Sequence, residues 1–506
     1  MNDAVCAERS RPWVLAATIL GSSMAFIDGS VVSVALPAMQ ANLAAPMSEA
    51  QWIANAYMLL LGALILIGGA SGDRFGRRRI FVIGVLVFTV ASVACGFAPS
   101  SAALIAARAV QGVGAALLVP NSLAIISAAF PEKERGRAIG TWAGASALTT
   151  ALGPVLGGWL TDTWSWRAIF FINVPVAAVA ITLMLWHMPE SRDRDTQSID
   201  SLGAALAVVG LACLTYGLTL ASDADWADPK VLAAVIAGAA VLVGFIWFES
   251  RARAPMMPLQ LFRSPAFSGA NAITLLLYFA LSGAMFFIPF NLIRIQGYSA
   301  MLAGAAFLPL SLIMGLLSRW SGGLIERYGP RRLLMIGPAI AAVGLALFAV
   351  PGIGGSYWTT FFPPMAVLGF GMAVSVAPLT TTVMRGAEDR HAGVASGINN
   401  ATARVAGMLA VALLGAIAVG VFARTLDQRL DRLQLRPEVR SALQAEVPKL
   451  AEAAVPKNVA PAEQPVVERA LRESFVRSFK VVSVIAAALA ALSAAVAWFT
   501  IDRKKR

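Results

Sequence analysis

Fourteen long apolar runs, separated by mostly short loops, dominate this sequence and constrain its fold more than any other feature. A membrane-spanning helix needs about 20 mostly apolar residues. Only 13% of the residues are charged, against about 25% in a typical soluble domain. The pattern predicts an all-α polytopic membrane protein with 14 transmembrane helices, near residues 12–38, 52–71, 80–98, 101–127, 137–159, 168–187, 201–222, 230–249, 266–290, 300–321, 332–350, 357–384, 392–422 and 479–501.

The distribution of Lys and Arg orients these helices. With the N-terminus in the cytoplasm, the inner loops and termini hold 23 Lys and Arg residues, whereas the short outer loops hold three, Arg167, Lys230 and Arg294. Cytoplasmic loops of membrane proteins carry the excess of positive charge. We therefore expect a multi-pass protein of the bacterial cytoplasmic (inner) membrane with both termini in the cytoplasm. The net charge of +12 reflects this topology and does not indicate a nucleic-acid partner.

A long polar segment, residues 423–478, interrupts the pattern between the last two apolar runs. Long loops cross the membrane largely regardless of their charge, so we expect this segment on the outer side. Apolar residues recur in it at helical spacing, as at Leu426, Leu430 and Leu433. Two interpretations are open: a pair of surface helices packed on the outer rim, or a docking surface for a periplasmic adaptor protein.

A short motif occurs twice, each time between two apolar runs. The first copy, GASGDRFGRRR, covers residues 69–79, and the second, GGLIERYGPRR, covers residues 322–332. Duplicated helix bundles are typical of transporters, with the substrate site between the halves. We therefore predict an N-terminal six-helix bundle (1–190), a linker with two inserted transmembrane helices (191–261), and a C-terminal six-helix bundle that includes the external loop 423–478 (262–506).

Each copy of the motif combines glycine, an acid and arginines at the cytoplasmic end of a span. Glycine lets helix ends approach closely, and the acid can pair with an arginine or with the N-terminus of a neighbouring helix. Such contacts would hold one conformation closed on the cytoplasmic side, whereas a solvated positive cluster explains only the arginines. The predicted cytoplasmic gate comprises Gly69, Asp73, Arg74, Gly76 and Arg78 in the first copy and Glu326, Arg327 and Gly329 in the second.

Very few charged residues lie deep inside the apolar runs, where a charge costs about 2.5–3.5 kcal/mol on insertion scales. From the helical rise, Asp28 in the first span and Arg108 in the fourth both lie about 10–15 Å below the outer surface. They can face one another across one bundle. A conformational change that alters their separation would switch the proton affinity of Asp28, which is a route to proton coupling. A static ion pair that joins the two spans is the alternative.

Further polar and aromatic side chains are candidates for the wall of a substrate cavity. Arg404 lies inside the thirteenth apolar run, although a long cation can also snorkel to a membrane surface. Amide side chains can equally form hydrogen bonds between helices. The predicted cavity residues are Phe26, Gln111, Asn121, Trp142, Asn291 and Arg404.

The fifth apolar run contains a Gly-Pro pair, Gly153 and Pro154. Proline removes a helix hydrogen bond and glycine loosens the backbone, so the helix should bend there. Gly157 and Gly158 then permit close packing against a neighbouring helix, which we expect to come from the other half. An ordinary packing kink is the alternative to a hinge.

Taken together, these motifs resemble the major facilitator superfamily, and specifically its fourteen-span drug:proton antiporters of the EmrB/QacA type. The resemblance covers nearly the whole chain apart from the long external loop. It rests on GDRFGRRR after span 2, RAVQGVGAA (108–116), GPVLGG (153–158), DGSVVSVALP (28–37) and WRAIFFINVP (166–175). Ser33, Ser71 and Thr149 depart from the family pattern.

The resemblance implies a role for each motif. It links Arg108 to proton coupling, and it associates the Gly153–Gly158 motif with export and with a hinge that seals one state against proton leak. It also implies the major facilitator fold and a proton-coupled antiporter that exports small hydrophobic or amphiphilic compounds.

Because Asp28 is the only acid well inside a span, neutral or singly charged cargo is favoured over dications. A dedicated exporter of one metabolite, lipid or siderophore is the alternative, and a non-transporting sensor or scaffold is a remote one. We expect no enzyme activity, since no catalytic triad, phosphate loop or metal-ligand set is present in the sequence. We also expect no cofactor and no metal, because the proton gradient would drive transport.

Overall fold

The computed structural model describes residues 8–191, 200–221, 226–252, 255–385, 392–433 and 436–501. Within these ranges every regular element is a helix, as the apolar runs predict. The first half contains η1 (Glu8–Ser10), α1 (Arg11–Leu43), α2 (Met47–Phe75), α3 (Arg77–Gly96), α4 (Ser101–Ala129), α5 (Glu132–Thr163), α6 (Ala168–Phe171) and α7 (Asn173–His187).

Two helices, α8 (Ser201–Leu220) and α9 (Pro229–Glu249), follow as the predicted inserted pair. The second half contains η2 (Leu259–Arg263), α10 (Pro265–Phe290), η3 (Asn291–Ile295), α11 (Ala300–Ala305), α12 (Leu308–Tyr328), α13 (Pro330–Leu347), α14 (Tyr357–Thr360), α15 (Phe362–Arg385), α16 (Ala392–Leu430), α17 (Pro437–Glu446), η5 (Val447–Glu452) and α18 (Gln464–Thr500).

Thirteen helices in the described part of the chain are long and apolar enough to cross a membrane. The expected fifth span forms as α5, a helix of 32 residues, but it is not among these thirteen. Its sequence begins with the charged run EKERGR and is rich in small and hydroxyl side chains, which lowers its hydropathy. The count of fourteen therefore stays a prediction.

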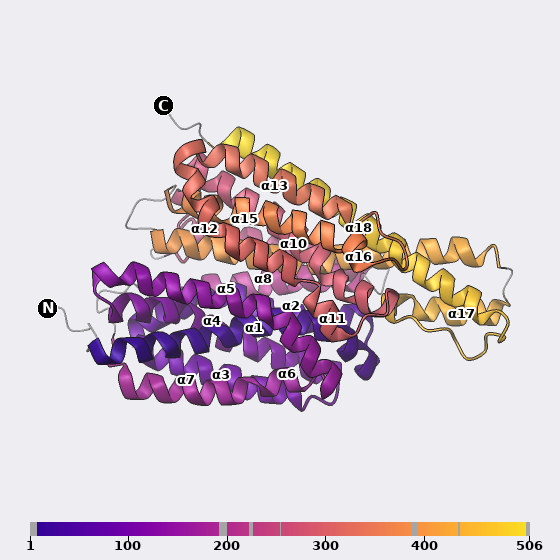
Figure 1. Cartoon of the computed structure of the whole chain (residues 1–506), viewed down its shortest axis with the longest axis horizontal. Coiled ribbons are helices and arrows are strands. Elements are labelled where there is room, and N and C mark those ends of the chain that lie inside the picture. Colours follow the sequence, from indigo (N-terminus) through magenta and orange to yellow (C-terminus); the bar gives the residue numbers. More distant parts are fainter. Residues whose placement is uncertain are drawn as a thin grey trace.

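The helices pack as two bundles that lie side by side (Figure 1). In the first, α1 packs on α5 and α7, and α4 packs on α2 and α3. In the second, α10 packs on α16 and α18, and α15 packs on α12 and α13. Two interfaces, which we call seams, join the bundles. In one, α2 packs along α16, and in the other, α5 packs on α11 and the adjoining α12.

The inserted pair covers one of these seams. α8 and α9 pack on each other, and α8 also packs on both α2 and α16. Leu59 and Ala63 of α2, Leu211 of α8 and Met408 of α16 form one small buried apolar cluster. The pair is thus attached along the α2–α16 seam and leaves the α5–α11 seam without such a cover.

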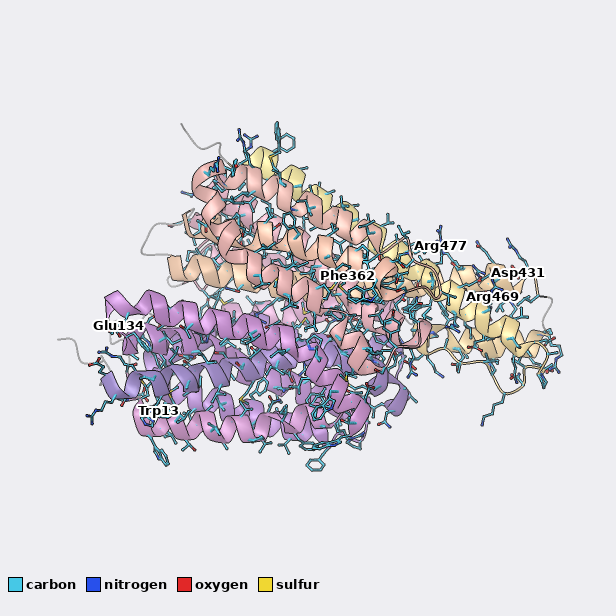
Figure 2. All side chains as sticks on the ribbon, viewed as in Figure 1. Trp13, Glu134, Phe362, Asp431, Arg469 and Arg477 are labelled. Carbon is cyan, nitrogen blue, oxygen red and sulfur yellow. The ribbon has the colours of Figure 1, made fainter. Side chains whose placement is uncertain are left out.

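The last two long helices continue well beyond the bundle (Figure 1). α16 ends at Leu430 and α18 begins at Gln464, whereas the sequence predicted a span end near residue 422 and a span start near 479. With α17 and η5 they form a projecting extension, marked in Figure 2 by Asp431 and Arg469. Separate surface helices, α17 and η5, are present as one interpretation expects, but the ends of α16 and α18 also project, which that interpretation did not include.

The projecting part has a buried apolar core. Leu430, Val439, Leu443, Val459 and Leu471 are all buried there, in a cluster continuous with the core of the bundles. We call this end of the molecule the extension end. The opposite end, which carries the first and last described residues, is the termini end, and Trp13 and Glu134 lie toward it in Figure 2.

Candidate coupling and transport site

Asp28 of α1 and Arg108 of α4 form a buried ion pair in the first bundle. Arg108 Nη1 donates to Asp28 Oδ2, and each residue is only 1% exposed. The predicted juxtaposition of these two charges is therefore confirmed. An unpaired charge at this depth would be strongly destabilising, so the two groups depend on each other.

A polar network holds the pair in place. Gln111 donates from Nε2 to Asp28 Oδ1 at 2.9 Å and accepts from Arg108 Nη1 at 2.6 Å. Arg108 Nε donates to the Ile53 carbonyl at 3.1 Å. Gln111 is completely buried and thus belongs to the ion-pair network and not, in this structure, to a cavity wall. The reason is its spacing, because residues three apart share one face of a helix.

Tyr57 of α2 completes the site and was not among the residues predicted from the sequence. The Arg108 guanidinium lies over its ring, 4.3 Å from the centroid, and its hydroxyl donates to the Ala25 carbonyl at 3.1 Å. The cation is thus balanced by a carboxylate, carbonyl and amide oxygens and an aromatic face. A proton on Asp28 would remove the only carboxylate of this network, so protonation and the position of Arg108 are physically linked.

The Gly-Pro motif of α5 packs on both bundles. A Cβ on Gly153 would lie 1.9 Å from Ser30 Oγ, and one on Gly157 would lie 2.2 Å from a Val31 methyl group, both on α1. A Cβ on Gly158 would instead lie 2.2 Å from the Ala300 carbonyl oxygen of α11. The expectation that Gly157 faces the other half is therefore wrong, because one residue turns the helix by about 100° and only Gly158 points across the seam.

The same seam is closed from both sides. A Cβ on Gly304 of α11 would lie 2.0 Å from the Pro154 carbonyl oxygen. Asp162, near the end of α5, accepts from the backbone N–H groups of Ala300 at 3.0 Å and Met301 at 2.7 Å. A carboxylate of one half thus caps a helix N-terminus of the other. Asp162 was not predicted, since an acid near a span end carries no distinctive sequence signal.

A segment of the extension also joins the two bundles. Residues Val447–Glu452 of η5, which we call the strap, pack on the ends of α1, α2 and η3. Gln40 of α1 donates from Nε2 to the Lys449 carbonyl at 3.2 Å. Arg294 pairs with Glu452 and donates to the Pro37 carbonyl of α1 at 3.5 Å.

The strap is held under backbone strain. Leu450 is buried, 1% exposed, and has φ +53°, a conformation that side chains with a Cβ rarely adopt. Burial raises the pKa of the Glu452 carboxyl, and Arg294 partly offsets this shift. The two halves are therefore tied together at the extension end by the strap as well as by α5 and α11.

The first gate loop is bonded within its own bundle. Asp73 accepts from Arg77 Nε at 2.8 Å and Nη2 at 2.7 Å. Arg78 donates to the Met188 carbonyl at 2.8 Å. Glu190, which sequence reasoning missed, accepts from the backbone N–H groups of Arg78 and Arg79 at 3.1 Å each, at the start of α3.

Glycine is required at the centre of this loop. Gly76 has φ +109°, and a Cβ there would lie 2.6 Å from the Glu190 carboxyl carbon. Its repeat partner Gly329 has φ +75°. A Cβ on Gly69 would make only an ordinary contact, 3.6 Å from Pro120, so nothing at that position demands glycine in this structure.

The two gate loops share a second geometric feature. Arg74 lies 5.4 Å from the ring centroid of Phe75, and Arg327 lies 5.4 Å from that of Tyr328. The side chain of Glu326 lies outside the described residues. For the gate side chains that are described, the hydrogen bonds and ion pairs stay within one half, so these loops do not join the halves in this conformation.

The remaining predicted cavity residues lie at separate places. Phe26 and Trp142 form an edge-to-face pair with centroids 6.0 Å apart, and Trp142 donates to Ser22 Oγ at 3.0 Å. Asn121 is fully buried and donates to the Gly68 carbonyl at 2.8 Å. It therefore joins α4 to α2 and does not line an open wall in this structure, because an amide this deep needs a backbone partner.

Asn291 is also buried, at the start of η3. Its Oδ1 accepts from Gln296 Nε2 at 3.1 Å. This bond lies at the extension end, close to the connection around Gly352, to which Gln296 also donates at 2.9 Å. Asn291 thus stabilises the turn after α10 and lies away from the Asp28–Arg108 pair.

Arg404 of α16 lies in the α2–α16 seam. Its Cβ lies 3.3 Å from the position of a Cβ built on Gly62 of α2. Its Nε is buried and has no hydrogen-bond partner among the described residues. Tyr57 and Tyr278 are the groups that act on it electrostatically. Arg404 therefore lies between the halves and not at a helix end, and its role in a cavity wall stays a prediction.

A comparison with known protein families decides the classification. The family described as Major Facilitator Superfamily matches residues 18–411, which includes the Asp28–Arg108 pair, the Gly-Pro motif and both gate loops. The chain belongs to the Major Facilitator Superfamily. Members with this fold are membrane transporters of small molecules and are not enzymes, and this chain is such a transporter.

Several relatives in this superfamily are named for resistance and export. The chain is 34% identical over 502 residues to the tetracenomycin C resistance and export protein of Streptomyces glaucescens, covering 97% of this chain and 92% of the relative. It is 34% identical to the multidrug resistance protein Stp of Mycobacterium tuberculosis, covering 86% and 81%. It is 33% identical to the methylenomycin A resistance protein of Bacillus subtilis, covering 80% and 87%.

Solved structures confirm the fold. A bacterial homologue of the human lysosomal transporter Spinster, in an inward-facing and occupied conformation, matches with a TM-score of 0.70 at 18% identity and covers 98% of both chains. The inward-open xylose transporter XylE of E. coli matches with a TM-score of 0.60 at 14% identity, covering 97% of this chain and 96% of that one. The all-helical major facilitator fold implied by the family resemblance is thus confirmed.

Proposed function

We propose that this chain is a proton-coupled antiporter of the EmrB/QacA type that exports small hydrophobic or amphiphilic compounds across the bacterial cytoplasmic membrane. The buried ion pair between Asp28 and Arg108 carries the proposal. A carboxylate whose partner is a cation on another helix can exchange that cation for a proton. Transport then needs no cofactor, because proton binding itself changes the charge balance in the first bundle.

The arrangement of the halves supports an alternating-access cycle. The α5–α11 seam and the strap close the extension end, while the described gate loops are bonded within their own halves. We assign the extension end to the outer side and both termini to the cytoplasm. Opening toward the outside then requires α5 and α11 to separate, and the gate loops would close the cytoplasmic side in that state.

The proposal includes α5 as the fourteenth span. α5 lies between α1 and α11 and contacts both bundles, and at 32 residues it is long enough to cross a bilayer. Its small and hydroxyl side chains pack against other helices, so they need not face lipid.

The cargo is proposed from the seam and from the relatives. Arg404 places a cation in the α2–α16 seam, with Tyr57 and Tyr278 near enough to act on it electrostatically, a setting that favours neutral or singly charged amphiphiles with an acceptor oxygen or an aromatic ring. Arg404→Gln should therefore change the order in which cargoes are preferred. A dedicated exporter of one metabolite is the second candidate, favoured by the near full-length match to a protein named for tetracenomycin C export. An adaptor that docks on the extension stays a prediction.

The test uses purified protein in proteoliposomes with an imposed proton gradient and a panel of dyes and antibiotics. Wild-type protein should move at least one cargo when the gradient is present and stop when a protonophore dissipates it. Asp28→Asn should abolish gradient-driven transport in a folded protein, whereas Glu438→Gln, which changes an exposed acid of α17, should transport normally. Gradient-driven transport by Asp28→Asn at the wild-type rate would overturn the coupling role.

A further inference from the structure

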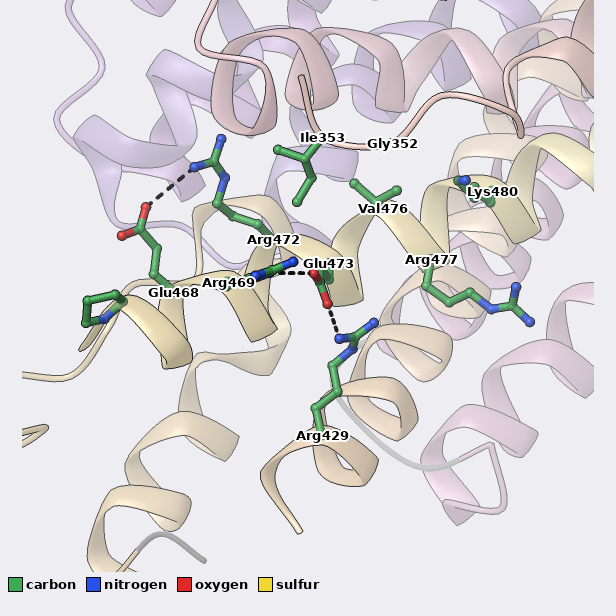
Figure 3. Close-up of a pocket in the computed structure, with 11 residues that line it drawn as sticks. Gly352, Ile353, Arg429, Glu468, Arg469, Arg472, Glu473, Val476, Arg477 and Lys480 are labelled. Carbon is green, nitrogen blue, oxygen red and sulfur yellow. Dashed lines mark hydrogen bonds and ion pairs between the residues drawn. The ribbon is translucent and has the colours of Figure 1, made fainter. Parts of the chain in front are cut away.

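A cavity of about 760 Å³ opens at the base of the extension, far from the coupling pair in the sequence and on other helices. Three segments form its walls: the end of α16 at Arg429, the stretch of α18 from Pro465 to Lys480, and the connection after α13 at Gly352 and Ile353. Figure 3 shows the side chains that these three segments contribute, with Arg429 and Arg469 meeting at Glu473. The volume lies within the range of about 300–1,000 Å³ that holds small-molecule ligands.

The lining of this cavity is strongly basic. It contains five cations, Arg429, Arg469, Arg472, Arg477 and Lys480, and two acids, Glu468 and Glu473, which leaves an excess of three positive charges. Glu473 pairs with Arg429 and with Arg469, the latter at 2.9 Å, and Glu468 lies 3.8 Å from Arg472 (Figure 3).

Several donors in the cavity are left unused. Among the described residues Arg477 has no hydrogen bond or ion pair, and Lys480 donates only to the Val350 carbonyl, at 3.1 Å. The Nε atoms of Arg429 and Arg472 are buried and have no partner there. An anion in the cavity can accept from the guanidinium of Arg477 and from the remaining donors of Lys480.

The cavity lies where a bilayer ends. After Lys480, α18 continues through 20 uncharged residues from Val481 to Thr500. At 1.5 Å per residue this run is about 30 Å long, the thickness of the hydrocarbon core. Lys480 and Arg477 therefore lie at the level of the lipid headgroups. Ile353, Pro465 and Val476 give the same cavity an apolar part of its lining.

We propose that this basic cavity binds the phosphate group of an anionic phospholipid, with the glycerol portion against its apolar wall. Guanidinium groups bind phosphate oxygens in a bidentate manner, and basic pockets at membrane boundaries recognise acidic headgroups. A free phosphate offers the same charge but has nothing to place against Ile353 and Val476. Zwitterionic lipids carry a compensating cation that the excess positive charge of the cavity disfavours.

The test is lipid retention by the full-length protein. Protein is exchanged into nanodiscs of mixed phosphatidylglycerol and phosphatidylcholine, and the retained lipid is counted by native mass spectrometry. Each juxtamembrane cation contributes about 1 kcal/mol to such binding, or about fivefold. The Arg477→Gln/Lys480→Gln double variant should therefore retain phosphatidylglycerol about 25-fold more weakly than wild type.

The matched control is Arg424→Gln. Arg424 is exposed on α16 and is not among the cavity-lining residues, so this variant should retain phosphatidylglycerol as wild type does. Val476→Trp, which fills the cavity without changing its charge, should also reduce retention and serves if the double variant misfolds.

Three results would overturn the proposal. The first is that wild type retains phosphatidylglycerol and phosphatidylcholine equally. The second is that the cavity variants retain as much phosphatidylglycerol as wild type does. The third is that millimolar inorganic phosphate displaces the bound lipid and, by itself, raises the melting temperature as much as phosphatidylglycerol does. This result would assign the cavity to a free anion. None of these results depends on the transport assay.

Discussion

Gly158 of α5 and Ala300 of α11 meet so closely that no side chain fits between them, since a Cβ on Gly158 would lie 2.2 Å from the Ala300 carbonyl oxygen. This contact joins one half of the transporter to the other. Because the obstructing atom belongs to the backbone, a larger residue cannot be accommodated by a rotamer change, and α5 and α11 would have to separate.

The first prediction follows from this contact. Gly158→Leu should populate a conformation that is open at the extension end and should reduce transport at least tenfold, a change of about 1.4 kcal/mol or more. Gly244→Leu on α9 is the control, because a Cβ there meets nothing within 4 Å. Cysteine accessibility at Ala303→Cys, a fully buried position of α11, reports the opening, and unchanged accessibility in Gly158→Leu would contradict the prediction.

The second prediction concerns the strap. Arg294 links Glu452 to the Pro37 carbonyl of the other half, so Arg294→Gln should loosen the strap. In a cysteine-replaced protein labelled at Ala41→Cys and Lys457→Cys, spin-label distances should broaden toward longer values. Arg440→Gln removes a comparable pair with Asp431 inside the extension and should leave the distribution as it was. Identical distributions in both variants would show that Arg294 does not secure the strap.

The third prediction is a pH dependence of the same distances. Burial raises the pKa of Glu452 above its ordinary value of 4.5 when the strap is closed, so the closed strap binds the proton more tightly than an open, hydrated one. The protonated Glu452 carboxyl therefore stabilises the closed strap fully below pH 4.5. This stabilisation is lost as the pH rises through the raised pKa of Glu452 in the closed strap. The charged group that pairs with Glu452 is Arg294.

This dependence is measured in an Asp28→Asn background, so that the coupling carboxyl does not contribute. The closed fraction should fall as pH rises from about 4.5 toward 7, and Glu452→Gln should abolish the change by keeping the site neutral. A closed fraction that rises with pH would reverse the sign and refute the argument.

The fourth prediction concerns Glu190, which accepts two backbone N–H groups at the start of α3. Glu190→Ala removes this cap and should destabilise the protein by about 1 kcal/mol, as at other helix N-termini. Thermal unfolding should show a melting temperature lower by about 2 °C. Glu438→Ala, at an exposed acid of α17, should leave the melting temperature unchanged, and equal effects of the two substitutions would argue against a specific cap.

Much of this site could be read from the sequence because charge is rare in the apolar runs. Asp28 and Arg108 were identifiable as partners from depth alone, and their pairing followed. The two copies of the gate motif predicted the two bundles, and the matched positions of Arg74 and Arg327 over neighbouring rings agree with a duplication.

Other features depend on tertiary contacts that no local pattern encodes. Asp162 and Glu190 are ordinary acids near helix ends until the fold places a helix N-terminus against each. Gly157 and Gly158 are adjacent glycines, and only the orientation of α5 decides which one faces the other half. The extension was missed as a continuation of α16 and α18 because its charged residues ended the hydropathy signal.

The inserted helices make the two flanks of the transporter unequal. With α8 laid over the α2–α16 seam, a lipophilic compound diffusing within the bilayer meets an extra helical wall on that flank. On the α5–α12 flank, α8 and α9 add no such wall, and large apolar side chains of α5 such as Leu148 and Leu152 are exposed. We therefore expect cargo that enters from within the bilayer to approach along the α5–α12 flank.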